Sequence, residues 1–180
     1  TLIIFTSDNG PTFNGGSDSP FFDSAKPFKS ETGWGKCSLR EGGIRVPMIA
    51  CWPNHIEAGS QSDLLSAFWD MMPTMCDVAG VECPPTDGIS MLPTMLGEDS
   101  KQEKHDFLYW EFHETDQIGV RMGDWKLVVK QGTPYLYNLA EDIHEDHDVA
   151  AQHPDLVERM KDIIRREHRP NDLFPVTLPQ

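Results

Sequence analysis

The sequence has few basic residues, few cysteines and no long apolar run. Lysine and arginine together number 15 against 29 aspartates and glutamates, which argues against nucleic acid or an anionic membrane as a general partner. No apolar run approaches the length of a transmembrane helix. The cysteines, at positions 37, 51, 76 and 83, form no CxxC pair and lack zinc-site spacing. We therefore expect neither a disulfide framework nor a zinc site, and we expect three of the four to be buried as small hydrophobic residues.

The charge is unevenly distributed along the chain. Residues 1–50 hold five basic and five acidic side chains, so the remaining residues carry the entire net charge of −14. An anionic substrate would be repelled by most of the surface and tolerated near the first fifty residues. We therefore look for a site for such a substrate in this part of the chain.

An apolar run near the start ends in two adjacent oxygen-bearing side chains. Residues 2–5 are continuously apolar, which predicts a strand covered on both faces, as in a parallel sheet. Asp8 and Asn9 follow, and Gly10-Pro11 breaks the strand, so both side chains can turn toward one cation. Carboxylate and amide oxygens are hard ligands that suit Ca2+ or Mg2+ better than a soft metal that prefers thiolates. An ordinary turn at the end of a strand remains the other interpretation.

A second segment, residues 36–45, supports the interpretation of the Asp8-Asn9 turn as a metal site. Lys36 stands five residues before Glu41-Gly42-Gly43-Ile44-Arg45. This spacing, together with the upstream Asp-Asn-Gly-Pro, resembles the sulfatase family of the alkaline-phosphatase superfamily. The resemblance continues through Asp70 to Thr74, Ala79-Gly80, Asp87-Gly88 and Gly123 to Leu127, and so covers most of the chain.

The resemblance implies a function and a role for each matching residue. The chain would be the carboxyl-terminal portion of a sulfuric ester hydrolase acting on sulfated sugars or glycans, in a periplasmic or secreted enzyme. Asp8 and Asn9 would supply half of a calcium shell whose other ligands lie outside this chain. Lys36 would be the catalytic, substrate-binding cation on the sulfate oxygens. We assign Glu41 and Arg45 mainly to structure.

The same resemblance predicts that the chain alone is inactive. The family nucleophile is a formylglycine made from the first residue of a C/S-x-P/A-x-R motif, and we expect this modification outside this chain. Cys83-Pro84-Pro85 matches the first and third positions of the motif, but Asp87 stands where the arginine is required. We therefore reject Cys83 as the nucleophile.

The first hundred residues are predicted to belong to the end of an α/β catalytic domain. Residues 12–34 alternate glycine, serine, proline and aromatics without a period, which predicts a long loop and suggests a wall of the substrate cleft. Residues 44–52 and 65–69 are predicted strands, and a helix is expected from Asp70 to Ala79, ending at Gly80. We place the boundary near residue 100, which gives domains 1–100 and 101–180.

Residues 101–180 are predicted to form a small α+β subdomain. Four aromatic or β-branched runs, at 107–112, 118–122, 125–130 and 135–139, predict an antiparallel sheet, with a hairpin at Gly123-Asp124. A helix beginning at Pro154 would place an apolar stripe on one face of that sheet. The predicted fold class is thus the end of an alkaline-phosphatase-like α/β core followed by a four-stranded sheet with one helix.

The remaining polar candidates are weaker. By resemblance, His113, Glu114 or Arg121 would overhang the cleft and contact the leaving-group sugar. Residues 141–148 mix carboxylates and imidazoles; a second metal site is one interpretation, and a structural acidic turn is the one that we favour.

Two alternatives to a sulfatase stay open at this point. The enzyme could be a phosphatase or phosphodiesterase of the same superfamily, or the chain could be a non-catalytic binding module derived from a sulfatase. The first strand, if unpaired on one edge, would also favour self-association of the isolated chain.

Overall fold

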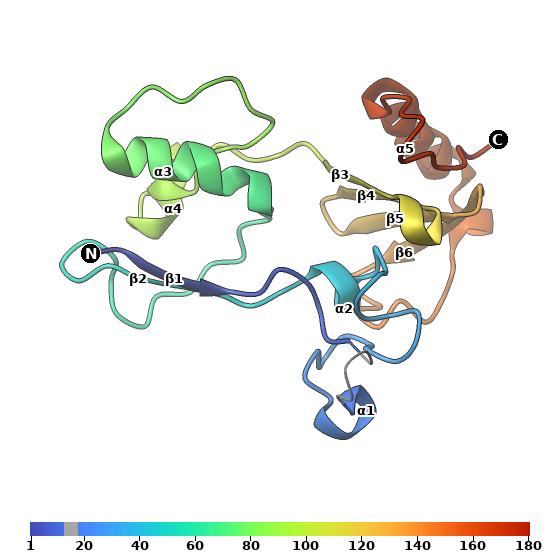
Figure 1. Cartoon of the computed structure of the whole chain (residues 1–180), viewed down its shortest axis with the longest axis horizontal. Helices are drawn as coiled ribbons and strands as arrows, with labels where there is room; N and C mark the ends of the chain where they lie inside the picture. Colours follow the sequence, from blue (N-terminus) through green and yellow to red (C-terminus); the bar gives the residue numbers. More distant parts are fainter. Residues whose placement is uncertain (13–17) are drawn as a thin grey trace. The chain divides into compact units, whose positions relative to one another are not determined.

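The computed structural model describes residues 1–12 and 18–180; part of the predicted loop at 12–34 therefore lies outside the described residues. The chain divides into two compact units (Figure 1). Unit 1 comprises Thr1–Thr6 and Met48–Asp106, and unit 2 comprises Ser7–Pro47 and Phe107–Gln180. These units cut across the boundary that we placed near residue 100, because residues 7–47 pack with the carboxyl-terminal residues.

Unit 1 contains a two-stranded sheet. Strand β1 (Ile3–Thr6) pairs antiparallel with β2 (Met48–Cys51). The parallel pairing expected for β1 is therefore wrong within this chain. The predicted burial is wrong as well, since Ile3 is 60% and Phe5 64% exposed. Among the described residues β2 is the one strand that pairs with β1, and the apolar side chains of Ile3 and Phe5 lie at the surface.

Two of the strands predicted within residues 1–100 differ in the structure. The strand expected at 44–52 shortens to β2, because residues 41–44 form a helical turn, α2 (Glu41–Ile44). The strand expected at 65–69 is replaced by extended chain and a 3-10 turn, η2 (Phe68–Asp70). The carboxylate of Asp70 accepts the backbone N–H of Ala67 at 2.7 Å, and this bond closes the turn.

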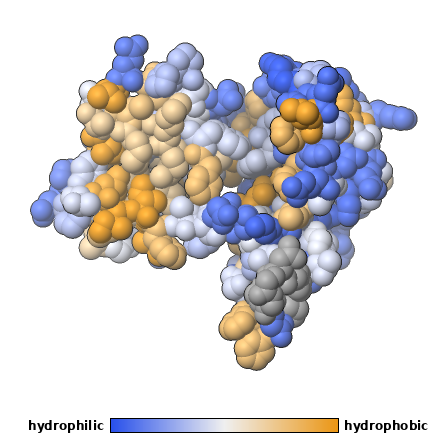
Figure 2. Space-filling view, in the orientation of Figure 1, coloured by the Kyte–Doolittle hydropathy of each residue, from blue (hydrophilic) through white to orange (hydrophobic). Residues whose placement is uncertain are grey.

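The predicted helix of unit 1 is confirmed as α3 (Met71–Ala79), with Gly80 in the left-handed conformation that ends it. The helix α4 (Leu92–Met95) and the 3-10 turn η3 (Asp99–Lys101) follow. In Figure 2, hydrophobic residues gather on the surface of the part that holds α3, α4, β1 and β2. Several large apolar side chains are exposed there: Ile3, Phe5, Met48, Ile49, Phe68, Met72 and Met75.

Unit 2 contains the predicted four-stranded meander. Its antiparallel strands run in the order β3 (Leu108–Phe112), β4 (Gln117–Met122), β5 (Trp125–Lys130) and β6 (Thr133–Asn138). The 3-10 turn η4 (His113–Thr115) joins β3 to β4. Gly123, with φ at 56°, lies in the predicted hairpin between β4 and β5. Shorter helical segments elsewhere in the unit are α1 (Ser19–Phe22) and η5 (Ala150–Gln152).

The two faces of this sheet carry different partners. Helix α5 (Pro154–Glu167) packs on one face, where Val157, Met160 and Ile164 meet apolar residues of β4, β5 and β6. Successive side chains of a strand point to opposite faces. Gln117 and Arg121 on β4 and Lys126 on β5 therefore face away from α5, toward the segment that includes α2.

Candidate functional site

The candidate site begins where β1 ends. Ser7 Oγ donates to the carbonyl oxygen of Asn9 at 2.9 Å, and the Asn9 backbone N–H donates to Asp8 Oδ1 at 3.0 Å. The Asn9 side-chain nitrogen donates to the carbonyl oxygen of Gly10 at 2.9 Å. The extended backbone thus breaks directly after the apolar run, as the sequence predicts.

Two backbone hydrogen bonds place this turn beside the second motif. The Gly10 N–H donates to the Gly43 carbonyl oxygen at 2.9 Å, and the Lys36 N–H donates to the Pro11 carbonyl oxygen at 2.9 Å. Gly10 is needed for this approach, because a Cβ there would lie 1.8 Å from the Gly42 carbonyl oxygen. The fold thereby brings the Asp8-Asn9 turn and Lys36 to one place in unit 2.

Lys36 lies in a constrained stretch of backbone with its side chain exposed. The next residue, Cys37, has φ at 69°, a left-handed conformation that is uncommon for a residue other than glycine. The Cys37 carbonyl oxygen accepts the Thr115 hydroxyl at 3.0 Å, and the Leu39 N–H donates to Gln117 Oε1 at 3.0 Å. The Lys36 side chain therefore projects from a backbone that bonds to both the Pro11 turn and the start of β4.

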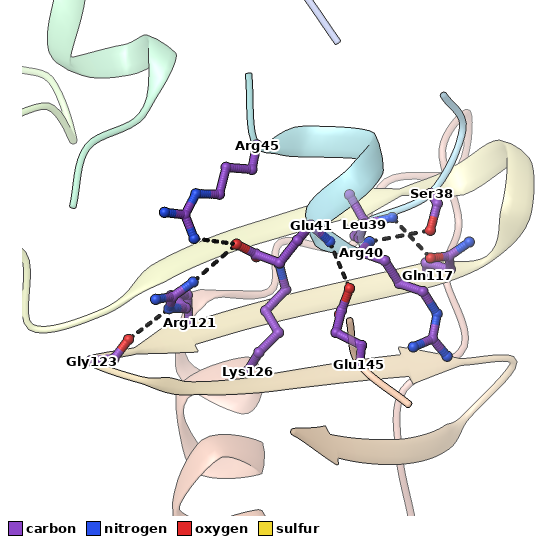
Figure 3. Close-up of polar contacts among 10 residues, drawn as sticks. All are labelled: Ser38, Leu39, Arg40, Glu41, Arg45, Gln117, Arg121, Gly123, Lys126 and Glu145. Carbon is purple, nitrogen blue, oxygen red and sulfur yellow. Dashed lines mark hydrogen bonds and ion pairs between the residues drawn. The ribbon is translucent and has the colours of Figure 1, made fainter. Parts of the chain in front are cut away.

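A buried ionic cluster anchors the same segment to the sheet (Figure 3). Glu41 Oε1 lies 2.9 Å from Lys126 Nζ, while its Oε2 lies 3.2 Å from Arg121 Nη1 and 3.4 Å from Arg45 Nη1. The Lys126 side chain is 0% exposed. Burial alone would raise the pKa of the Glu41 carboxyl, but the charges of Lys126 and Arg121 outweigh it and hold that pKa below its ordinary value. These contacts agree with the structural role predicted for Glu41 and Arg45.

A second buried carboxylate completes the anchor. Glu145, with φ at 54°, accepts the Glu41 backbone N–H on its Oε2 at 2.9 Å. Burial raises the pKa of the Glu145 carboxyl, although the nearby Lys126 charge opposes the change. Within the same acidic run, Asp142 accepts the backbone N–H groups of Asp146 and His147. No metal-binding group of three or more His, Cys, Asp or Glu side chains occurs among the described residues, and the run forms hydrogen-bonded turns.

The weaker sugar-contact candidates are engaged elsewhere or simply exposed. Arg121 Nε donates to the Gly123 carbonyl oxygen at 2.6 Å while Nη1 contacts Glu41, so its guanidinium is held in the anchor. His113 is exposed and its Nδ1 donates to the Pro175 carbonyl oxygen at 2.9 Å. Its role as a substrate contact stays a prediction.

The donors of the predicted metal site fit a hard cation in kind. Asp8 offers a carboxylate, and Asn9, whose amide nitrogen bonds to Gly10, offers its amide oxygen. Two such oxygens are a minority of the six to eight that Ca2+ takes. The turn is therefore suited to complete a calcium shell, and further ligands would be needed beside it.

Sequence reasoning missed the residues that hold the Lys36 segment from the sheet side. Thr115 and Gln117 flank Asp116 in a polar stretch, and Lys126 stands between the apolar Trp125 and Leu127. Both contexts are typical of residues that face solvent. Here this face of the sheet is covered by the segment that includes α2. Lys126 lies in the segment from Gly123 to Leu127 that resembles the family, but no motif in the sequence distinguishes Thr115 and Gln117 from ordinary exposed polar residues.

Comparison with protein families gives one match over most of the chain. The family model described as "N-sulphoglucosamine sulphohydrolase, C-terminal" matches residues 30–169. The chain is 35% identical over 135 residues to N-acetylgalactosamine-6-sulfatase of Mus musculus, an alignment covering 70% of this chain and 23% of that protein. It is 30% identical over 167 residues to arylsulfatase A of Bos taurus, covering 87% of this chain and 31% of that protein.

Solved structures share the fold. The crystal structure of Ps i-CgsB superposes with a TM-score of 0.76 at 28% identity, covering 99% of this chain and 39% of that one. Phosphonate monoester hydrolase of Agrobacterium radiobacter gives a TM-score of 0.66 at 23% identity over 99% of this chain and 39% of its own, a likeness of fold alone. The chain thus spans less than half the length of each of these proteins.

Proposed function

Since the chain belongs to the N-sulphoglucosamine sulphohydrolase C-terminal family of sulfatases, we propose that it is the carboxyl-terminal part of a sulfuric ester hydrolase acting on sulfated sugars or glycans. Relatives named for sulfated sugars, including N-acetylgalactosamine-6-O-sulfatase of Bacteroides thetaiotaomicron at 27% identity, support this substrate class. So does the structure of Ps i-CgsB with k-i-k-neocarrahexaose, at 30% identity and a TM-score of 0.73.

The observation that carries the proposal is the hydrogen bond from Lys36 N–H to the Pro11 carbonyl oxygen. This backbone bond joins the segment of Lys36, whose side chain is exposed, to the turn that follows Asp8 and Asn9, and so supports a site that the three residues share. A compact cation in this position would bind sulfate oxygens and stabilise the negative charge that develops as the S–O bond breaks. The two motifs of the sequence then act as one site.

Asp8 and Asn9 would hold calcium together with ligands from outside this chain. A bound Ca2+ would act as a Lewis acid toward a sulfate oxygen. The nucleophile, which we expect to be a formylglycine, would also come from outside these residues. The share of this chain is to bind and orient the sulfate group and to hold one side of the metal shell.

The test is Lys36→Ala in the full-length protein, assayed with an aryl sulfate. We expect kcat to fall by about a hundredfold to a thousandfold, as for loss of one preorganised charge contact. Lys26→Ala is the matched control, since Lys26 is an exposed lysine of the same loop that pairs with Asp23. An unchanged kcat for Lys36→Ala would contradict the role of Lys36.

A parallel assay with an aryl phosphate separates the proposal from the phosphatase alternative. The sulfatase proposal predicts that the wild-type protein turns over the sulfate ester with the higher kcat/KM. A preference for the phosphate ester would favour the other branch of the superfamily.

A further inference from the structure

We propose that Thr115 and Gln117 are positioning residues for Lys36, an inference that rests on the function proposed for that lysine. Both lie at the junction of η4 and β4, on the sheet face opposite α5. They are separated from the Lys36 segment by more than seventy residues of sequence, yet they bond to it directly.

Three hydrogen bonds form a continuous link. Gln117 Oε1 accepts the Leu39 N–H at 3.0 Å, and Gln117 Nε2 donates to Thr115 Oγ1 at 2.8 Å. The Thr115 hydroxyl in turn donates to the Cys37 carbonyl oxygen at 3.0 Å. Each end of the Gln117 amide is used once, so the link fixes both the amide orientation and the direction of the hydroxyl hydrogen.

The link is bonded to Cys37, whose backbone conformation is unfavourable for a residue other than glycine. Cys37 is held at a φ of 69°, and a non-glycine residue keeps such a conformation only when its surroundings impose it. The Thr115 bond is made to the carbonyl of this residue. Together with the bond from Lys36 N–H to Pro11, it holds the peptide group that precedes Lys36 and the one that follows Cys37.

The support itself is rigid. The Gln117 side chain belongs to a residue that is 4% exposed, and Gln117 is paired with Phe112 on β3 and with Lys130 on β5. A residue in an inner strand of a packed sheet holds its neighbours more precisely than a residue in a loop. The carboxyl-terminal sheet is thus connected to the proposed catalytic lysine by two side chains.

The experiment is a double-mutant cycle in the full-length protein. Thr115→Val keeps the shape of the side chain and removes both of its hydrogen bonds, so we expect kcat on an aryl sulfate to fall about tenfold to a hundredfold, with KM changing less. Thr115→Ser restores the hydroxyl and is expected to recover most of the activity. Thr133→Val, a substitution of an exposed threonine on β6, should leave kcat unchanged.

The cycle is completed in the Lys36→Ala background. If Thr115 acts through Lys36, Thr115→Val should have no further effect on kcat there, whereas a merely structural role would give the same loss in both backgrounds. Additive losses would overturn the inference, as would an unchanged kcat for Thr115→Val beside a strongly reduced Lys36→Ala. An active Lys36→Ala protein would instead refute the proposed function. Thr115→Ala serves if the valine variant does not fold.

Discussion

At the scale of single residues, the burial of the Lys126 ammonium depends on the carboxylate of Glu41. A buried ammonium is tolerated because a buried carboxylate lies 2.9 Å away and two arginines share its other oxygen. Replacing the carboxylate leaves the buried ammonium without its ion-pair partner, which is far more costly than losing an exposed pair.

We therefore predict that Glu41→Gln lowers the free energy of unfolding by about 3–5 kcal/mol. Urea denaturation followed by circular dichroism measures this change. Glu31→Gln is the control, since Glu31 is exposed in the loop that precedes α2. This substitution should change the urea midpoint little. Equal midpoints for Glu41→Gln and the wild type would show that the cluster contributes no stability.

The two buried carboxylates are predicted to respond to pH in opposite directions. The lowered pKa of Glu41 means that its stabilising contribution is present above the ordinary value of 4.5 and is lost as pH falls through the lower folded value. The raised pKa of Glu145 means that its contribution is present below 4.5 and is lost as pH rises through the higher folded value.

Glu145→Gln isolates the second effect. The substitution keeps an acceptor for the Glu41 N–H and removes the charge, so it should stabilise the protein more at neutral pH than below pH 4.5. Urea midpoints of the variant and the wild type at the two pH values give this difference. A gain that is the same at both pH values, or larger in acid, would contradict the assigned direction.

At the scale of elements, the approach of the Asp8-Asn9 turn to α2 depends on the absence of one Cβ atom. Gly10→Ala would place a carbon 1.8 Å from the Gly42 carbonyl oxygen, so the turn must move and its bond to Gly43 must lengthen. We predict that the free energy of unfolding falls by about 1–3 kcal/mol. Hydrogen exchange at the amides of Gly10 and Lys36 should also be faster.

Gly119→Ala provides the matched control for this prediction. A Cβ at Gly119 would meet its nearest neighbours at 3.5 Å, an ordinary contact, although the residue lies inside the sheet. Exchange at Gly10 and Lys36 should be unaffected in this variant. Protection of both amides in Gly10→Ala at the wild-type level would contradict the account of the turn.

Elements with a clear period were predictable from the sequence, and elements fixed by distant contacts were not. The β3 to β6 meander and α5 show alternating or helical apolar patterns, and the structure confirms them. The turn at Glu41 depends on a bond to Glu145, and Asp70 is held by a bond from the backbone N–H of Ile89. Local composition gives no indication of such partners.

In the candidate site, too, some residues could be predicted from the local sequence and others could not. Asp8, Asn9 and Lys36 were predicted from short motifs and the spacing within them. Thr115 and Gln117 approach Lys36 only because a sheet face is covered by a segment from another part of the chain. Their place in the polar stretch of residues 113–117 predicts exposure, and the covering segment makes that prediction fail.

At the scale of the whole molecule, the sheet of unit 1 exposes a continuous apolar face. Phe5 lies opposite Ile49 and Ile3 opposite Cys51 in the register of β1 and β2, so all four side chains share one face, and all four residues are exposed. Such a face beside an open strand edge favours association.

We therefore predict that the isolated chain self-associates. Size-exclusion chromatography with light scattering should show species above the mass of one chain, and Phe5→Lys should shift them toward the monomer. A clean monomer for the wild-type chain across the accessible concentrations would refute this prediction.

The isolated chain is also predicted to lack hydrolytic activity, since its sequence contains no C/S-x-P/A-x-R motif and its turn offers two calcium ligands. An aryl sulfate assay of the chain beside the full-length protein tests this directly. Turnover by the chain alone would place the nucleophile within these residues. Calorimetric binding of calcium and a sulfated glycan, without turnover, would favour a binding module.

Peptide mass spectrometry of the native protein is the decisive test of the proposed formylglycine-dependent sulfatase. We expect a peptide with the C/S-x-P/A-x-R motif, outside the residues described above, whose first residue has become an aldehyde. A native protein in which every cysteine and serine peptide is recovered without that modification would refute the proposal.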